Sequence, residues 1–296
     1  MKTVSIIVPF YNAEAFLDCL FDCFDKCKFI EGDEIILVNN GSTDSSVSIC
    51  KKRIRSNGIY KLLTYVEQAD SYAARNYGLK YASGEILAFT DSDCKPTPEW
   101  LEEVRKVRIG QIMAGNITLE IVENNIWESY DAVSHLGQTE LEATVGHVAT
   151  ANMAVNRMDF DKVGLFSVLF SGGDYDWSQR ARTKGLKIVY NNKALVHHPS
   201  RKTYEEILTR EKRTAYGFGK SYQQSGKPYW RLKIRYILRL FKINSYFKVS
   251  GKLKHYGINL SARIYFMFHL FDMRFKQIDA ACKGYRAVSA RKLGIK

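Results

Sequence analysis

Two carboxylates, Asp91 and Asp93, directly follow the apolar run of residues 85–90. The run has the length and composition of a buried strand. In an open α/β sheet, ligands bind outside the carboxyl ends of the strands, which is where these two acids would lie. Two carboxylates at this spacing can bind one hard divalent cation, or divide between a cation and a ribose hydroxyl. Because solvated loop acids are also common, the pair by itself leaves both interpretations open.

Three other segments would bring polar groups to the same edge of the sheet. The residues after the first strand offer an amide and a carboxylate, those after the second strand offer two amides, and a later helix carries a guanidinium in its first turns. Amides can pair with the edge of a nucleobase, and a guanidinium can approach a phosphate. Each segment alone is more typical of a turn, a helix cap or a surface charge. The residues concerned are Pro9, Tyr11, Asn12, Glu14, Asn39, Asn40 and Arg75.

The elements that must position these groups alternate along the first hundred residues. Alternation of short apolar runs with helical stretches implies βαβ units, hence an α/β fold with a mainly parallel sheet covered on both faces. No G-x-G-x-x-G or Walker A sequence follows the first strand. The predicted strands are 4–9, 34–38, 61–66 and 85–91, and the predicted helices are 13–26, 45–55 and 71–82.

Beyond residue 97 the pattern is less regular. We divide the chain into a domain at 1–225, with its nucleotide-binding part at about 1–107 and its acceptor part at about 108–225, and a basic, aromatic helical extension at 226–296. The further predicted elements are helices at 98–107, 127–136, 174–183 and 204–225 and strands at 110–119 and 151–155.

Composition is that of an ordinary globular protein. Of the 296 residues, 46% are hydrophobic and 25% are charged, enough to form a sizeable core. The six cysteines do not form a disulfide framework, so we expect free thiols in a reducing cytosol. The first residues run straight into an apolar strand, so we expect no signal peptide. No apolar run approaches the roughly 20 residues that span a bilayer.

Basic residues are concentrated in the last third of the chain. Residues 201–296 carry 23 Lys and Arg against 5 Asp and Glu, a net charge of +18, whereas residues 1–200 carry a net charge of −5. Two stretches, 229–242 and 262–275, have the pattern of interfacial helices. We expect 229–296 to bind an anionic membrane surface; packing of both helices on the first domain is the alternative. No nucleic-acid-binding module is recognised, so we expect no nucleic acid as partner.

In this order, the motifs resemble those of the family-two glycosyltransferases with the GT-A fold. The resemblance covers about residues 1–220. It implies a mainly parallel, Rossmann-like sheet flanked by helices. It also implies inverting transfer of a sugar from a nucleotide-diphosphate donor to a hydroxyl of a glycan or lipid-linked acceptor. The matching segments are Val4–Asn12, Val38–Asp44, Ala73–Gly78, Gly84–Asp93, Thr150–Val155, Gly172–Trp177 and His198–Arg201.

The resemblance assigns the nucleotide-sugar donor site to the polar residues at the carboxyl edge of the predicted sheet. It implies that Asp93 binds Mg²⁺ or Mn²⁺, that Asp91 binds the ribose or the metal, and that His198 completes the metal shell or touches the diphosphate, with His197 as the alternative. UDP-sugars are the favoured donors, although two Asn residues stand where the family has aspartates. The other nucleotide-sugar ligands implied are Pro9, Tyr11, Asn12, Glu14, Asn39, Asn40, Arg75, Arg201, Arg210 and Arg213.

The resemblance assigns the proton chemistry to Asp174, at the start of a predicted helix. The family motif reads acid-Asp-x-Asp, and here Gly173 replaces the customary Glu. Two glycines before the acid would let the backbone approach the sugar closely. Capping of the helix is the structural alternative for Asp174. The implied acceptor-binding residues are Asn152, Gly173, Asp176 and Trp177.

Two other functions agree with part of the pattern. A sugar-phosphate nucleotidyltransferase also binds nucleotide and metal, but normally has a Gly-rich basic loop, which residues 9–12 do not supply. A catalytically silent GT-A protein that recruits partners to a membrane is the third possibility, and the presence of both Asp93 and Asp174 argues against it. We therefore expect a metal-assisted inverting glycosyltransferase, cytoplasmic and peripheral on the inner face of the cell membrane.

Overall fold

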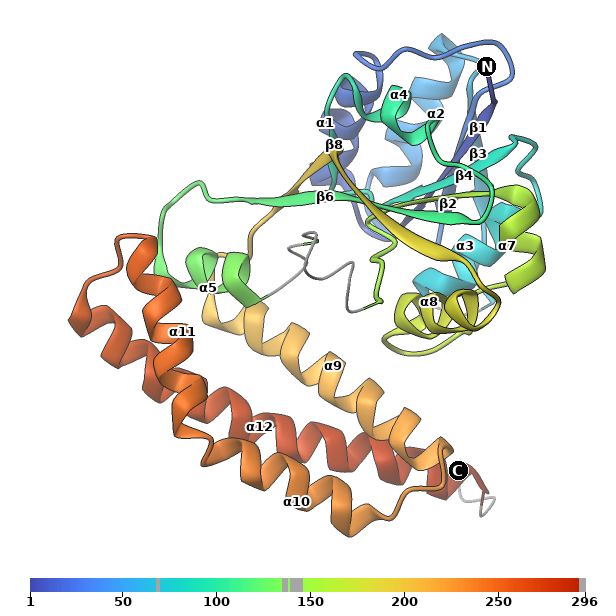
Figure 1. Ribbon diagram of the computed structural model, residues 1–296. Helices are drawn as coiled ribbons and strands as arrows, with labels where there is room; N and C mark the ends of the chain where they lie inside the picture. The colour runs from blue at the N-terminus through green and yellow to red at the C-terminus, as the bar shows by residue number, and fades with distance from the viewer. Residues whose placement is uncertain (68–69, 135–137, 139–145, 293–296) are drawn as a thin grey trace. The chain divides into compact units, whose positions relative to one another are not determined.

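A computed structural model of the chain describes residues 1–67, 70–134, 138 and 146–292 (Figure 1). The chain forms two compact units, and the main division falls at Pro199, not at residue 225 as the sequence predicts. The reason is that the helix after Pro199 packs along the last helix of the chain. The sheet unit contains Met1–Leu119, Leu136–Leu169 and Gly173–Pro199, and the helical unit contains Glu120–His135, Phe170–Gly172 and Ser200–Lys296.

Four strands form the parallel half of the sheet, in the order β3-β2-β1-β4. All residues of β1, β2 and β4 are buried, which explains the continuous apolar runs of their sequences. The connecting helices lie where the sequence predicts them, so the βαβ units are confirmed. The elements are β1 (Val4–Phe10), α1 (Glu14–Phe24), β2 (Glu34–Asn39), α2 (Ser46–Ser56), β3 (Tyr60–Thr64), α3 (Ser71–Leu79) and β4 (Ile86–Thr90).

The other half of the sheet continues the order as β4-β7-β6-β8-β5 and contains antiparallel pairs. The sheet predicted as mainly parallel is therefore parallel in one half only. Strand β8 is not predicted from the sequence, because its middle residues 191–193 are Asn, Asn and Lys and much of it is exposed. The strands are β5 (Lys95–Pro96), β6 (Gln111–Glu120), β7 (Asn152–Asn156) and β8 (Lys187–Pro199).

Helices cover both faces of the sheet (Figure 1). Alternate residues of β1 divide between two cores: Val4, Ile6 and Val8 face one side, and Ile7 faces the other. Each large apolar side chain that is fully buried in these cores contributes about 1.5–3 kcal/mol. The first core is closed by α1, α2 and α4 (Trp100–Val104), and the second by α3, α7 (Arg157–Val163) and α8 (Gly173–Thr183).

The helical unit is built around α9 and α12, which approach closely. Gly219 and Gly284 make this possible, because a Cβ at either position would lie 2.0 Å from a backbone oxygen of the facing helix. A capping box of Thr203 and Glu206 starts α9. The predicted helix 127–136 ends outside the described residues. The helices are α5 (Ile126–Ser134), α9 (Tyr204–Gln224), α10 (Tyr229–Leu240), α11 (Ile243–His255) and α12 (Leu260–Lys292).

Across the described residues, no helix combines the length and the apolar character needed to cross a bilayer.

Candidate active site

The loops that follow β1 and β2 are fastened to each other. The side-chain oxygen of Asn12 accepts a hydrogen bond from the Thr43 backbone N–H at 2.8 Å. The backbone N–H of Asn12 donates to the Ser42 hydroxyl at 3.0 Å. Glu14 accepts from the Ser45 amide at 2.9 Å. Asn12 also has a positive φ of 47°, which Asn tolerates better than most residues. Asn12 and Glu14, which were expected to bind the nucleotide, therefore connect these two loops in the structure.

The two amides after β2 have different surroundings. Asn39 is buried, and its side-chain oxygen accepts from the Ser42 amide at 2.8 Å. Asn40 donates from its side-chain nitrogen to the Tyr65 carbonyl at 2.9 Å, which sets the orientation of its amide. Tyr11 is 60% exposed, whereas Pro9 is buried within β1. Of these four side chains, only those of Tyr11 and Asn40 are not buried.

Arg75 forms an ion pair with Asp91. Arg75 is only 3% exposed, and its guanidinium lies 5.6 Å from the centre of the Tyr72 ring. The Asp91 side chain is 32% exposed. A buried guanidinium needs a matching charge, and Asp91 supplies it. Arg75 therefore contacts Asp91 in the structure, and its approach to a phosphate stays a prediction.

Asp93 faces His198, the second residue from the end of β8. The His198 Nε2 atom lies 3.4 Å from Asp93 Oδ2, and the histidine side chain is 6% exposed. The pairing of β5 with β8 explains this contact, because Lys95 lies opposite His197 in the register, two residues after Asp93. Successive residues of a strand point to opposite faces, so only one of the two histidines can face Asp93. That residue is His198.

Asp93 and His198 offer oxygen and nitrogen atoms of the kind that could hold a divalent cation. His198 Nδ1 lies 2.8 Å from the Pro199 carbonyl, so Nδ1 carries the proton that it donates there. The other ring nitrogen, Nε2, then faces the Asp93 carboxylate. Such an arrangement suits a cation, and metal-binding histidines commonly donate their other N–H to a backbone carbonyl. Among the described residues, no group of three or more His, Cys, Asp or Glu side chains is placed to hold a metal ion.

Asp174 lies at the N-terminus of α8 and is held by three groups. Its Oδ1 accepts from the Tyr72 hydroxyl at 3.0 Å and from the Tyr175 amide at 2.8 Å. Its Oδ2 lies 3.5 Å from His147 Nε2, and the side chain is 16% exposed. Burial disfavours the charged form, but the interactions with His147, the Tyr175 amide and the Tyr72 hydroxyl outweigh it. The pKa of Asp174 is therefore lowered from its ordinary value.

Helix α3 joins the two groups of acids. Tyr72 contacts Asp174, and Arg75, one turn later on the same side of α3, contacts Asp91. The Tyr72 hydroxyl stays protonated, since burial and the nearby Asp174 charge raise its pKa. Asp174 and Asp91 therefore both contact side chains from the first turns of α3.

Gly173 has a packing role that the sequence does not reveal. A Cβ at this position would lie 2.8 Å from both the Ser167 carbonyl oxygen and the Tyr72 ring. The customary Glu therefore has no room here, because Tyr72 fills the space. The preceding Gly172 has a positive φ of 82°, which glycine adopts without strain.

The other expected acceptor ligands lie in different environments. Asn152 is fully buried and bonds to Trp100 Nε1 and to two backbone carbonyls. Trp177 is fully buried and stacks on Phe160, with the two ring centres 5.1 Å apart. Both side chains therefore serve the core. Asp176 pairs with Arg180 at 2.9 Å and accepts from the Ser167 hydroxyl at 2.6 Å, and it stays partly exposed.

The expected phosphate-binding arginines belong to the helical unit. Arg201 and Arg210 both pair with Asp131, at 3.2 Å and 3.1 Å, and Arg210 also pairs with Glu211. Burial lowers the pKa of Arg201. Arg213 is exposed and lines a separate depression of that unit. Although they were predicted to share one helix face, Arg210 is buried and Arg213 is not.

Tyr72 and His147 are site residues that sequence reasoning missed. Tyr72 lies three residues before Arg75, and this spacing could have pointed to it. His147 lies in the least regular part of the sequence and offers no comparable signal.

Proteins of known class resemble this chain in sequence. The glycosyltransferase AglE of Haloferax volcanii is 32% identical over 224 residues, which cover 72% of either chain. The UDP-Glc:alpha-D-GlcNAc-diphosphoundecaprenol beta-1,3-glucosyltransferase WfgD of Escherichia coli is 30% identical over 127 residues, or 41% of this chain and 47% of that protein. The chain thus spans about half the length of WfgD.

Solved structures share the fold. The mannosyltransferase PcManGT of Pyrobaculum calidifontis, in complex with GDP-Man and Mn²⁺, superposes with a TM-score of 0.63 over 95% of this chain and 86% of that one, at 16% identity. At this identity the likeness shows the GT-A fold, as predicted. Glycosyl transferase family 2 matches residues 5–164, and Glycosyl transferase family group 2 matches residues 90–275. From these matches and the identity to AglE, the chain belongs to glycosyl transferase family 2.

Proposed function

We propose that this glycosyltransferase is an inverting enzyme that uses Asp174 as its general base. The observation that carries the proposal is the environment of Asp174, a largely buried carboxylate whose pKa is lowered and which shares helix α3 with the Asp91 site. A base must be ionised at the working pH and must lie in the site where the bond changes.

In the proposed reaction, an acceptor hydroxyl attacks the anomeric carbon from the face opposite the diphosphate. Asp174 takes the hydroxyl proton as the new C–O bond forms. The bond from the anomeric carbon to the phosphate oxygen breaks, and its electron pair leaves with the diphosphate. Tyr72 and His147 hold the Asp174 carboxylate in place during this step. Attack from the opposite face inverts the configuration of the anomeric carbon.

We propose a UDP-sugar as donor, and Mg²⁺ or Mn²⁺ as cofactor. The amide of Asn40, oriented by Tyr65, would bind the uracil edge, and Asp91 would bind the ribose. Asp93 and His198 would hold the cation, which when bound neutralises charge on the departing diphosphate. The UDP-Glc in the name of WfgD supports this donor class, while GDP-Man in PcManGT marks the competing one.

We propose a lipid-linked glycan as acceptor and a cytoplasmic location at the inner face of the membrane. The name of WfgD includes a diphosphoundecaprenol acceptor, and the net charge of +18 on residues 201–296 would attract an anionic leaflet. The acceptor site would include Gly173 and Asp176, and it would exclude the buried Asn152 and Trp177.

A donor screen tests the proposal. Purified protein with Mn²⁺ is mixed with UDP-sugars and GDP-mannose, and release of nucleoside diphosphate is measured with and without lipid-linked acceptors. We expect one UDP-sugar to be turned over by the wild type, and transfer to be abolished by Asp93→Ala and by Asp174→Ala. Asp161→Ala, a change of an exposed carboxylate on α7, is the matched control and should retain activity.

Three results would contradict the proposal. Normal transfer by Asp174→Ala would remove that residue from the mechanism. Pyrophosphate release from a nucleoside triphosphate would identify a nucleotidyltransferase. Absence of thermal stabilisation by any nucleoside diphosphate with Mn²⁺ would argue against a donor site, because a bound ligand stabilises the folded protein.

A further inference from the structure

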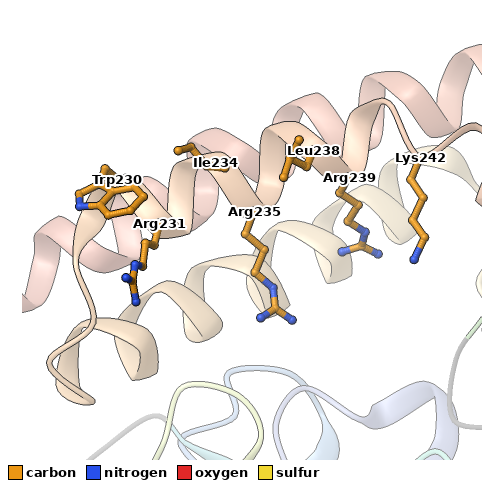
Figure 2. Close-up of a pocket in the computed structure, with 7 residues that line it drawn as sticks. All are labelled: Trp230, Arg231, Ile234, Arg235, Leu238, Arg239 and Lys242. Atoms are coloured by element: carbon orange, nitrogen blue, oxygen red, sulfur yellow. The ribbon is translucent and has the colours of Figure 1, made fainter.

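Helix α10 and the two residues that follow it expose two parallel rows of side chains, one apolar and one cationic (Figure 2). Residues three or four apart lie on the same side of a helix, so each row runs along the helix axis. Each cation directly follows an apolar residue in the sequence, which places the cationic row about 100° around the helix from the apolar row. The apolar row is Trp230, Ile234, Leu238 and Phe241, and the cationic row is Arg231, Arg235, Arg239 and Lys242.

The core of the helical unit does not use the apolar row. Helix α10 packs on that core through a third row, Leu232, Tyr236 and Leu240, which lies about 200° from the apolar row. Side chains of this buried row are at most 8% exposed, whereas those of the apolar row are 46–69% exposed. A contiguous exposed apolar surface on a folded protein commonly marks an interaction site.

The cationic row has no acidic partner. In the part of the chain that the structure describes, none of the ion pairs includes Arg231, Arg235, Arg239 or Lys242. Figure 2 shows all four side chains extending away from the helix axis on one side. Together with three residues of the apolar row they line a surface depression of ≈ 600 Å³. Three of the four are arginines, whose planar guanidinium groups bind phosphate with two hydrogen bonds.

We propose that this face of α10 binds the surface of an anionic phospholipid bilayer. The apolar row would enter the boundary between head groups and acyl chains, and the cationic row would bind lipid phosphates. Trp230 stands at one end of the apolar row, and indole rings favour this boundary. The inference rests on the proposed membrane association of residues 229–296 and narrows it to one helix face.

Charge argues for a membrane over a second copy of the chain. A twofold contact would bring the same patch of both copies together, and the two cationic rows would repel each other. An anionic leaflet instead complements the row. Helix α12 offers a contrast, since its exposed apolar row of Ile264, Phe268, Phe271 and Phe275 is followed in sequence by Tyr265, His269, Asp272 and Lys276. The one cation among these four neighbours, Lys276, pairs with Asp272 at 2.6 Å, so α10 is the better lipid-binding face.

Vesicle sedimentation tests the inference with the full chain. We expect binding to vesicles of phosphatidylglycerol and phosphatidylcholine in equal amounts, no binding to phosphatidylcholine alone, and release by high salt. Combined Arg231→Gln, Arg235→Gln, Arg239→Gln and Lys242→Gln should lower partition several hundredfold, at roughly fivefold per cation. Combined Trp230→Ser, Ile234→Ser and Leu238→Ser should also abolish stable binding.

Matched variants control for charge and hydrophobicity. Lys51→Gln, Lys52→Gln, Arg55→Gln and Lys187→Gln remove the same charge from exposed positions of the sheet unit and should leave binding intact. Phe268→Ser with Phe271→Ser changes the α12 row and should also leave it intact. All these side chains are exposed, so the fold should be kept, and thermal unfolding checks this.

The outcomes separate this inference from the proposed function. Release of nucleoside diphosphate, measured without vesicles, should be the same in the α10 variants and the wild type. The inference would be overturned if the variant without the α10 cations bound vesicles as well as the wild type does. It would also be overturned if the α12 changes abolished binding. A wild-type dimer that the Trp230, Ile234 and Leu238 changes dissociate, seen by light scattering, would show a second copy as the occupant and also overturn it.

Discussion

The sheet unit and the helical unit use charge in opposite ways. In the sheet unit, Asp91, Asp93 and Asp174 each face a particular partner at a particular distance. Along α10 of the helical unit and at Lys242 just beyond its end, four cations stand in a row with no acidic partner among the described residues. The first arrangement gives specificity through a few placed atoms, and the second gives affinity through summed charge. Single substitutions should therefore be severe in the sheet unit and mild on α10.

The largest expected effect is that of Asp174→Asn. The change keeps the shape but removes the base, so kcat for transfer should fall by about 10²–10⁴ while donor affinity stays. Steady-state kinetics with donor and acceptor measures both. Asp161→Asn, a change of an exposed carboxylate on α7, is the matched control and should leave kcat nearly unchanged. Equal losses in both variants would remove the distinction between the two acids.

His198→Gln should have the next largest effect. Loss of an imidazole facing Asp93 should raise the Mn²⁺ concentration needed for UDP binding by about 10- to 100-fold. Calorimetric titration of UDP at several Mn²⁺ concentrations measures this without turnover. His197→Gln, on the adjacent residue of the same strand, should leave the Mn²⁺ requirement unchanged. The assignment fails if His197→Gln has the larger effect.

Tyr72→Phe should change the pH dependence more than the rate at neutral pH. The Tyr72 hydroxyl stabilises the ionised Asp174, so its removal raises the pKa of that carboxyl. Because the base acts as the carboxylate, activity should be lost at a higher pH on acidification, with the acid limb of kcat/KM moved up by about one pH unit. Tyr77→Phe is the control on the same helix, because the Tyr77 hydroxyl bonds to Tyr81 and not to Asp174. A limb that stays in place would mean that Tyr72 does not act on Asp174.

The smallest expected effect is that of a single change in the cationic row. Arg239→Gln alone should lower vesicle partition by about fivefold, because each cation near an anionic surface contributes about 1 kcal/mol. Arg239→Lys keeps the charge and should bind nearly as the wild type does. Complete loss of vesicle binding in Arg239→Gln would contradict this contrast between the two units. It would indicate a specific lipid site and not the added effect of several charges.

Local patterns in the sequence predict much of the fold. Strands β1, β2 and β4 lie inside continuous apolar runs, so their positions follow from a few neighbouring residues. Strand β8 was missed because Asn191, Asn192 and Lys193 interrupt its apolar pattern. Residue 225 marks a change in composition, but packing places α9 with α12, which no local pattern reveals.

Within the candidate site, the sequence predicts residue types better than partners. Asp93 and either His197 or His198 were expected near one cation, and the register of β5 with β8 brings His198 to Asp93. Arg75 was expected near a phosphate, and the structure shows that it pairs with Asp91. The reason is that a buried guanidinium binds the nearest carboxylate, and that neighbour is defined only when α3 packs beside β4.

The sequence by itself determined the family, the order of the motifs and the concentration of positive charge after residue 200, because these depend on residue types and short spacings. Only the tertiary structure decided that Tyr72 reaches Asp174 across 102 residues of sequence, and that its ring occupies the space beside Gly173. It also decided which rows of α10 are buried and which are exposed. Periodicity reveals that a helix has distinct sides, but only packing determines which side the core covers.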